Sequence, residues 1–209
     1  MFSMNKIILA SSSVRRKALL NQIGLSVETI KPEIDEKLNP RLKPRGNAEQ
    51  LSLAKVNAVA QKLKDDNLKI SKASKIMNED VIIIAADTFI VFNGEILGKP
   101  IDKKDAKKTL LKLSGKSHSV ITGFTILEMN SHKTITKSVV TKVFFRKISL
   151  KEIDAYIKTG EPMNKAGSYG MQDLAAIFVE RIEGEPFNVV GLPLSALTEE
   201  LKKFGVKLF

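Results

Sequence analysis

An aspartate at the end of a strongly apolar run is the residue best placed for chemistry in this chain. The run from Val81 to Ala86 is rich in β-branched residues, which predicts a strand buried on both faces. Asp87 and Thr88 follow it, and Lys99 returns after an Asn93-Gly94 pair that favours a hairpin turn. A carboxylate and an ammonium meeting at a strand end suit a site for a metal ion and phosphate groups. The alternative is an aspartate that caps a turn and a lysine on the surface.

A serine cluster followed by two arginines is the second candidate. It directly follows a predicted strand from Lys6 to Ala10, and Ser13 is the expected N-cap of a helix that begins at Val14 and is closed by Gly24. Hydroxyls and backbone N–H groups at a helix N-terminus attract phosphate, and arginines add charge and forked donors. The candidate residues are Ser11, Ser13, Arg15 and Arg16. A capped helix with a solvated arginine pair is the alternative.

Loop carboxylates and a helical lysine come next. The polar loop between Pro32 and Pro40 contains Glu33, Asp35 and Glu36. Any of them could help to hold a divalent cation if the loop folds over the site, although loop acids are commonly just solvated. Lys55 lies at the edge of the apolar stripe of a helix predicted over residues 47–64. Its side chain points either into a cleft or into water.

A Gly-rich, irregular passage from Glu161 to Gln172 carries two further candidates for ligand contacts, Lys165 and Gln172. It follows a helix that the capping box Ser149-Leu150-Lys151-Glu152 predicts. His118, by contrast, stands at the start of a predicted strand without a visible carboxylate partner. A structural hydrogen bond is therefore favoured over a catalytic role for it.

The elements that must position these residues alternate between strands and helices. Strands are predicted over residues 6–10, 26–30, 81–86, 89–92, 118–127, 134–145 and 177–182, and helices over 14–23, 47–64, 103–113, 150–159 and 189–204. This order predicts an α/β fold with a mixed, twisted central sheet flanked by helices. No repeat or clear linker interrupts it, so a single domain over residues 1–209 is expected. The segment from Lys64 to Asp80 is interpreted as a helix end and a surface loop without chemistry.

Composition excludes several classes of function. The chain contains no cysteine, which excludes disulfides, thiolate metal sites and a cysteine nucleophile, and its two histidines lack ligand spacing. Neither a signal peptide's apolar core nor a run of membrane-spanning length is seen, so a cytoplasmic location without membrane association is expected. The net charge of +11 comes from lysines spread along the chain, without a base-stacking aromatic motif. A polyanionic small molecule explains this charge at least as well as a nucleic acid does.

Four segments, taken together and in order, resemble the signature segments of the Maf family of nucleoside triphosphate pyrophosphatases. They are LASSSVRRKALL, AADTFIVFNGEILGKP, LSGKSHSVITG, and EPMNKAGSYGMQ with NVVGLPL, and the resemblance extends from about Ile7 to Leu201. It implies a Maf/ITPase-like fold. It also implies hydrolysis of a nucleoside triphosphate to the monophosphate and pyrophosphate.

The resemblance also implies roles for residues. Asp87 matches the family's proton acceptor, Lys55 and Lys99 match lysines of the same pocket, and Glu36 matches an acid that positions metal or water. Ser11, Ser13, Arg15 and Arg16 match the phosphate-binding segment, and Lys165 is assigned with them to the substrate. Two carboxylates, Asp87 and Glu36, suffice for Mg²⁺ or Mn²⁺ when phosphate oxygens complete the coordination. A homodimer is a further expectation from the family.

Three positions bear on substrate choice. Arg15, Thr88 and Gln172 match the branch that prefers dTTP and UTP, whereas the branch acting on 7-methyl-GTP differs at the last two. The Gln172 amide offers a donor and an acceptor to the imide edge of uracil or thymine. Departures from the family pattern are Val14 in place of proline, Asn164 in place of aspartate, and Asp173-Leu174-Ala175 in place of a more Gly-rich stretch. The last is expected to change the loop beside the base pocket.

Three alternatives remain open at this point. A nucleotide-binding regulator of cell division would keep the fold without turnover, but it would have less need of Asp87, Lys55 and Lys99. A pyrophosphatase of 7-methyl-GTP or another nucleotide would keep the reaction and change the substrate. An RNA-binding domain rests on the charge alone, and a steep salt dependence of RNA binding would support it.

Overall fold

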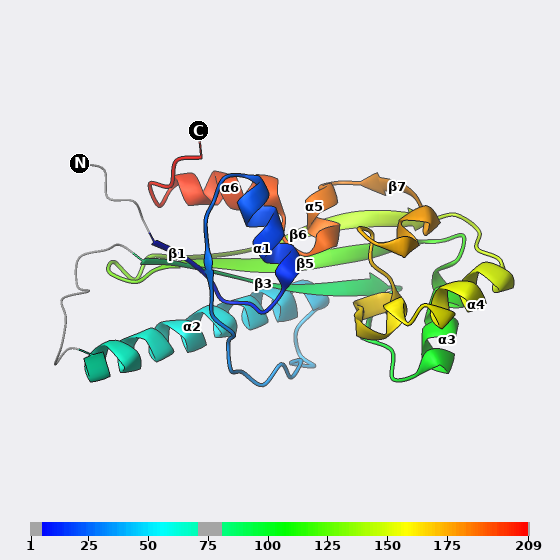
Figure 1. Ribbon diagram of the computed structural model, residues 1–209, viewed down its shortest axis with the longest axis horizontal. Helices are drawn as coiled ribbons and strands as arrows, with labels where there is room; N and C mark the ends of the chain where they lie inside the picture. Colours follow the sequence, from blue (N-terminus) through cyan, green and yellow to red (C-terminus); the bar gives the residue numbers. More distant parts are fainter. Residues whose placement is uncertain (1–5, 71–80, 209) are drawn as a thin grey trace. The chain divides into compact units, whose positions relative to one another are not determined.

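The computed structural model describes residues 6–70 and 81–208 of the chain (Figure 1). The strands are β1 (Lys6–Leu9), β2 (Glu28–Thr29), β3 (Val81–Phe92), β4 (Glu95–Leu97), β5 (Ser117–Glu128), β6 (Thr134–Phe145) and β7 (Val179–Glu183). The helices are α1 (Val14–Gln22), α2 (Pro44–Ile70), α3 (Lys103–Leu113), α4 (Leu150–Lys158), α5 (Pro186–Val190) and α6 (Leu194–Lys202). Three 3-10 helices lie between α4 and β7, namely η1 (Glu161–Asn164), η2 (Ala166–Ser168) and η3 (Leu174–Phe178). Most of the surface loop predicted up to Asp80 lies outside the described residues.

The strands form one mixed sheet in the order β2-β1-β3-β5-β6-β7, with β4 paired to β3. β1 pairs in parallel with both β2 and β3, whereas β3 with β4, and β6 with β7, are antiparallel. The predicted α/β fold with a mixed sheet is therefore confirmed. Within the described residues, no helix combines the length and the apolar character needed to cross a membrane.

Two compact units share this chain. Unit 1 comprises Met1–Asp87, Gly123–Ser138 and Leu194–Phe209, and unit 2 comprises Thr88–Thr122 and Val139–Pro193. The strands β3, β5 and β6 each contribute residues to both units. The sequence offers no sign of this division because continuous strands, rather than linkers, cross it.

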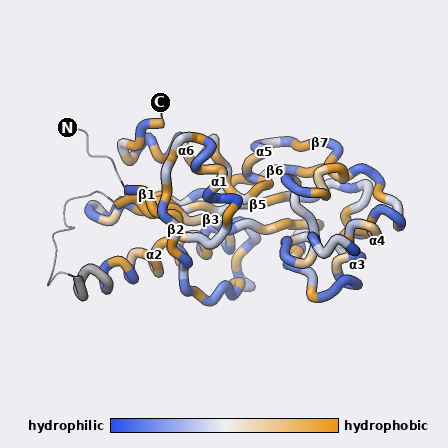
Figure 2. Tube along the Cα trace, viewed as in Figure 1, coloured by the Kyte–Doolittle hydropathy of each residue, from blue (hydrophilic) through white to orange (hydrophobic). Residues whose placement is uncertain are grey.

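The core of unit 1 lies between helices and the parallel strands. Alternate residues of β1 and β3, among them Ile8 and Ile83, pack against Val56 and Val59 of α2. Helices α1 and α6 lie on the other side of these strands (Figure 1). Most residues within β1 and β3 are hydrophobic, while hydrophilic and hydrophobic residues alternate along α2 (Figure 2). This pattern is what a helix with one face on a sheet requires.

The core of unit 2 is built around α3 and α4. Their inward residues, among them Leu110 and Ile153, pack with strand residues such as Val143 and Phe145 and with Phe178 at the end of η3. The inward positions of α3, Ala106, Leu110 and Leu113, are all fully buried. The predicted capping box of α4 is also present, because the Ser149 and Glu152 side chains each bond the other residue's backbone N–H.

The predicted end of a strand before Asp87 is wrong. β3 is one strand of 12 residues that continues through Asp87 and Thr88. These polar residues remain in the sheet because each side chain has a polar partner, Lys55 for Asp87 and Thr122 for Thr88. Long-range pairing thus overrides the low strand propensity of aspartate. The predicted hairpin is confirmed, since Asn93 and Gly94 both take positive φ between β3 and β4.

Other boundaries also differ from the prediction. The expected final helix over residues 189–204 is two helices, because Gly191 ends α5 with φ +112° and Pro193 follows. The strand predicted from residue 177 begins at Val179, since the residues before it form η3. α2 is longer than expected and begins at Pro44, a residue favoured in the first helical turn. β2 is shorter than expected, at two residues.

Candidate active site

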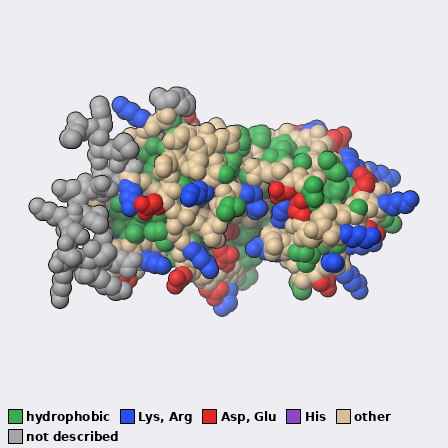
Figure 3. All heavy atoms as spheres, viewed as in Figure 1, with side chains coloured by type: hydrophobic (Ala, Val, Ile, Leu, Met, Phe, Trp, Pro, Cys, Tyr) green, Lys and Arg blue, Asp and Glu red, His purple; other side chains and the backbone are tan. Residues whose placement is uncertain are grey.

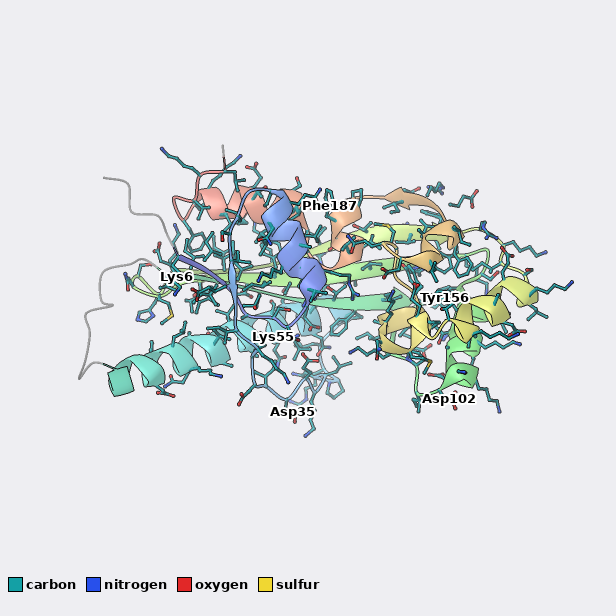
Figure 4. The ribbon with its side chains drawn as sticks, in the orientation of Figure 1. Lys6, Asp35, Lys55, Asp102, Tyr156 and Phe187 are labelled. Atoms are coloured by element: carbon teal, nitrogen blue, oxygen red, sulfur yellow. The ribbon has the colours of Figure 1, made fainter. Side chains whose placement is uncertain are left out.

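A buried lysine between two carboxylates is the main polar feature of unit 1. Lys55 of α2 and Asp87 of β3 form an ion pair, with residue exposures of only 6% and 7%. The Lys55 Nζ also lies 2.8 Å from Oε1 of Glu36, in the loop between β2 and α2. Figure 4 labels Lys55 on α2 and Asp35 on that loop. The Lys55 side chain therefore points toward the two carboxylates and not into water, the alternative that the sequence left open.

The strand pattern explains how Asp87 reaches Lys55. Side chains alternate along β3, so Asp87 shares a face with Ile83 and Ala85, which pack against α2. Lys55 occupies the same side of α2 as Val59, one turn further along the helix. Two buried charges at this position stabilise each other, whereas loss of either would leave the other unpaired in a poorly solvated environment.

The serine–arginine segment adds cations and hydroxyls within unit 1. Ser13 is the N-cap of α1, as predicted, and its Oγ accepts from the Arg16 N–H at 3.4 Å. The buried Ser11 Oγ accepts from the Ser13 N–H at 3.1 Å and from Arg16 Nη1 at 3.4 Å. Arg15 is exposed. The segment follows β1, so it lies at the carboxyl ends of parallel strands, where ligands bind in open α/β sheets.

Arg16 is electrostatically coupled to the carboxylates. Burial lowers the pKa of its guanidinium, the charges of Asp87 and Glu36 raise it, and Arg15 lowers it further. The structure thus brings Ser11, Arg16, Glu36, Lys55 and Asp87 into one polar group, here named the unit 1 site. It combines two cations, two carboxylates and a hydroxyl, which is a composition suited to phosphate chemistry.

The other loop acids lie elsewhere. Asp35 forms an ion pair with Lys37 at 2.7 Å, and Glu33 lies 3.8 Å from Lys62. All four of these side chains are largely exposed. Among the three acids of this loop, Glu36 is therefore the one that lies beside Lys55.

The unit 1 site fits a divalent cation of the Mg²⁺ type. Within the described residues, no group of three or more His, Cys, Asp or Glu side chains could hold a metal ion. Asp87 and Glu36 nevertheless converge on the same ammonium, so two carboxylates are available together. Mg²⁺ commonly uses one or two carboxylates and completes its coordination with water and substrate phosphates.

The remaining candidates lie in unit 2. The Thr88 hydroxyl is 3.0 Å from that of Thr122 and 3.4 Å from the Gly191 carbonyl oxygen. Lys99 and Gln172 are exposed. The Gly167 N–H donates to the Gly98 carbonyl at 2.9 Å and thereby joins the loop of Lys99 to the passage that carries Lys165 and Gln172.

Lys165 is paired in a way the sequence did not indicate. Its Nζ lies 3.1 Å from Glu161 Oε1 and also contacts Asp173 Oδ2. Glu161 stands in a motif segment, and Asp173 was recognised only as a departure from the family pattern. An open cavity of about 660 Å³ in unit 2 includes both acids in its lining, with Tyr156, Leu174, Ile177 and Phe178 among the apolar walls. No predicted site residue lines this cavity.

Two further polar residues, Thr122 and Asn188, were not identified as candidates from the sequence. Asn188 is fully buried and donates to the Val120 carbonyl and to the Thr141 hydroxyl, both at 3.0 Å. Thr122 donates to the Asn188 carbonyl at 3.1 Å, so it connects Asn188 to Thr88. The signal that could have identified them is their position in the motif segments, Thr122 in LSGKSHSVITG and Asn188 in NVVGLPL.

The structural hydrogen bond predicted for His118 is present. Its Nε2 lies 2.7 Å from the Tyr169 hydroxyl, and its ring packs edge-on against Phe145. Burial lowers the pKa of His118 to about 4, so the imidazole is neutral at physiological pH. Burial also raises the pKa of Tyr169, which therefore keeps its hydroxyl proton.

The charged surface is mixed. On the face drawn in Figure 3, Lys and Arg side chains are spread among uncharged and acidic side chains. Several of the lysines form ion pairs, such as Lys107 with Asp154 and Lys202 with Glu199, each at 2.6 Å. A single basic stripe for a nucleic acid backbone is not visible on this face.

Known proteins are similar to this chain along its length. A family model described as Maf-like protein matches residues 6–204. A dTTP/UTP pyrophosphatase of Alkaliphilus metalliredigens (strain QYMF) is 44% identical over 200 residues, which cover 96% of each chain. A dTTP/UTP pyrophosphatase of Bacillus pumilus (strain SAFR-032) is 40% identical over 206 residues, which cover 99% of this chain and 100% of that protein.

A solved structure supports the fold. The Ham1 protein of Staphylococcus aureus superposes with a TM-score of 0.51 at 12% identity, over 95% of this chain and 99% of that one. At this identity the likeness concerns the fold alone.

Proposed function

Because the chain belongs to the Maf family, we propose that it is a nucleoside triphosphate pyrophosphatase that hydrolyses dTTP and UTP to the monophosphate and pyrophosphate. The observation that carries the proposal is the buried Lys55 shared by Asp87 and Glu36 beside Arg16. Relatives named for this activity, at 40% and 44% identity over nearly the whole chain, support the pyrimidine substrates.

The proposed reaction is an in-line displacement at the α-phosphorus. A water oxygen forms the new bond to phosphorus while the bond from phosphorus to the α,β-bridging oxygen breaks. The pyrophosphate leaves with the electron pair, and the water proton passes to Asp87, the proposed acceptor. Negative charge grows on the leaving group, and Lys55, Lys99, Arg15 and Arg16 are the proposed cations that stabilise it.

The remaining residues bind the substrate and the cation. Ser11 and Ser13 are proposed to contact the phosphates, and Lys165 is proposed to belong to the residues that bind the substrate. Asp87 and Glu36 are proposed to hold Mg²⁺ or Mn²⁺, which when bound would neutralise phosphate charge and favour ionisation of water. Thr88 and Gln172 are proposed to select the pyrimidine base. The homodimer and the cytoplasmic location stay predictions.

Pyrophosphate release with Mg²⁺, measured over a panel of nucleotides, tests this proposal. The panel comprises dTTP, UTP, CTP, GTP and 7-methyl-GTP, and Asp87→Asn is compared with the wild type. Turnover of dTTP and UTP is expected to fall about 100-fold or more in Asp87→Asn, which cannot accept the proton. A chelator should abolish turnover, and added Mg²⁺ or Mn²⁺ should restore it.

The possible results separate the alternatives. Preference for 7-methyl-GTP would keep the reaction and overturn the pyrimidine substrates. Nucleotide binding without any turnover in the wild type would favour a regulator over an enzyme. Equal turnover by Asp87→Asn would contradict the proposed acceptor.

A further inference from the structure

Lys165 is held between two carboxylates at the base of the Gly-rich passage. Its side chain is 10% exposed, with Glu161 at 15% and Asp173 at 42%. The pair of Lys165 with Asp173 joins two residues that are 8 positions apart and thereby closes the passage into a loop. Gln172 immediately precedes the second of these residues, and its own side chain is exposed.

Glu161 connects this loop to the rest of unit 2. Its Oε1 accepts from the Tyr156 hydroxyl of α4 at 2.9 Å, and its Oε2 accepts from the Leu174 N–H at 3.1 Å. Burial raises the pKa of Tyr156, with the bond to Glu161 adding to the effect, so the hydroxyl remains a donor at neutral pH. One carboxylate thus anchors α4, Lys165 and the backbone two residues beyond Gln172.

The backbone of the loop packs directly against the ion pair. A Cβ built on Gly170 would lie 2.9 Å from both Lys165 Nζ and Asp173 Oδ2. Glycine, which lacks this atom, allows this approach without displacement of the two charged groups. The Asp173 N–H also donates to the Gly170 carbonyl at 3.2 Å, which forms a turn around Gln172.

We infer that Glu161, Lys165 and Asp173 form an ion-paired clamp that positions the Gln172 amide to read the pyrimidine base. The inference rests on the proposed function and makes the three clamp residues positioning residues. Gly170 and Asp173 are joined by a backbone hydrogen bond, and Asp173 and Leu174 are bonded to Lys165 and Glu161, while Gln172 itself is exposed. This is the arrangement that a rigid reader of a ligand edge requires. Pre-ordering the loop reduces the entropy lost when the base binds.

The charges of the clamp oppose direct phosphate binding by Lys165. The ammonium carries one positive charge and its two partners carry two negative charges, so the clamp as a whole is negative. A polyanionic triphosphate would be repelled by it. A phosphate contact by Lys165 and a positioning role can therefore be distinguished by nucleotide binding. A phosphate contact would affect all nucleotides equally, whereas a positioning role would affect the choice between bases.

Base selectivity in binding tests the clamp without depending on turnover. The dissociation constants of the α,β-methylene analogues of UTP and CTP are measured by titration calorimetry with Mg²⁺. The variants are Asp173→Asn and Lys165→Met, each alone and combined with Gln172→Ala. The wild type is expected to prefer the UTP analogue, and each single clamp variant should reduce that preference about tenfold. In the Gln172→Ala background the same changes should alter the ratio by less than about twofold.

A matched control removes another ion pair of the same unit. Asp154→Asn disrupts the pair with Lys107, which joins α3 to α4 at 2.6 Å, and is expected to leave the ratio unchanged. Thermal unfolding of every variant shows that it is folded, and Asp173→Asn is the mildest because this side chain is partly exposed.

Several results would overturn the inference. One is an unchanged ratio in folded Asp173→Asn and Lys165→Met. Equal weakening for both analogues would instead indicate that Lys165 is a phosphate ligand. If the clamp variants changed the ratio as much in the Gln172→Ala background, the clamp would act independently of the Gln172 amide. Equal wild-type affinity for both analogues would show that the Gln172 amide does not select the base, so the clamp would have no reader to position. Failure of the proposed function would be seen separately, as a lack of pyrophosphate release from UTP.

Discussion

Single side chains in this protein are defined by the partners that fold around them. Lysine side chains usually lie at the protein surface, yet the Lys55 ammonium is buried between Asp87 and Glu36. Buried charges persist only when they are paired. His118, in contrast, is buried without a charge, as a neutral ring hydrogen-bonded to Tyr169. Each arrangement has a consequence that can be measured in solution.

Stability is predicted to fall with acid because of His118. Its pKa is about 4 when folded and 6.5 when unfolded, so below pH 6.5 the unfolded chain binds a proton that the folded chain does not. The folded state should lose up to about 3 kcal/mol from this group as the pH falls from 6.5 to 4. Urea unfolding at pH 7 and pH 4.5 checks it.

The control for this prediction is His118→Gln, which removes the titrating group and keeps a hydrogen-bonding side chain. Its loss of stability between the two pH values should be smaller than that of the wild type. An equal loss in both proteins would assign the effect to other groups.

Elements of unit 1 approach each other more closely than side chains usually permit. A Cβ built on Gly123 of β5 would lie 2.3 Å from the Ala48 carbonyl carbon of α2. The absence of a side chain at this position lets α2, which carries Lys55, rest on the strand backbone. Strand glycines commonly mark such contacts between backbones.

Gly123→Ala is predicted to destabilise the protein by about 1–3 kcal/mol or more, because α2 must move away from β5. Activity should fall as well, since Lys55 moves with the helix. Urea unfolding and UTP turnover measure the two effects. Gly46→Ala in α2 is the matched control, because the atoms nearest to its Cβ would be those of the Leu42 side chain, at 3.4 Å or more.

That control should be neutral or more stable by up to about 1 kcal/mol, since alanine is the better helix former. If the two alanine variants had the same stability, the close contact between α2 and β5 would not be a constraint.

At the scale of the whole molecule, charge is the dominant property. The net charge of +11 is distributed over the chain, with 34 Lys and Arg against 23 Asp and Glu. Such a field attracts polyanions from a distance and is screened by salt within about 10 Å at 0.1 M. It suits a nucleoside triphosphate that must be captured from dilute solution.

The kcat/KM for UTP is predicted to fall about two- to tenfold as NaCl is raised from 20 to 500 mM at a fixed Mg²⁺ concentration. The cause is the screening of long-range attraction, so kcat should change little. Steady-state kinetics over the salt series measures both parameters. A kcat/KM that is independent of salt would contradict the steering, and tight RNA binding with a steeper salt dependence would support the nucleic-acid alternative.

The amino-acid sequence determined the local features of this protein. Ser13 caps α1, Ser149 and Glu152 form a capping box, and the Asn93-Gly94 turn closes the β3–β4 hairpin, all as predicted. These features depend on backbone groups within a few residues, so short-range chemistry is enough to specify them. The order of strands and helices likewise indicated the α/β class, because hydrophobic periodicity is also a local signal.

Only the tertiary structure decided which distant residues meet. Lys55 and Asp87 are 32 positions apart, and their pairing depends on α2 packing against one face of β3. The same long-range partners kept Asp87 and Thr88 inside a continuous strand, against their local preference. The pairing of Asp173 with Lys165, 8 positions away in an irregular passage, was also not predicted. Whether a charged side chain is solvated or buried in a pair depends on the packing of elements, which sequence spacing does not encode.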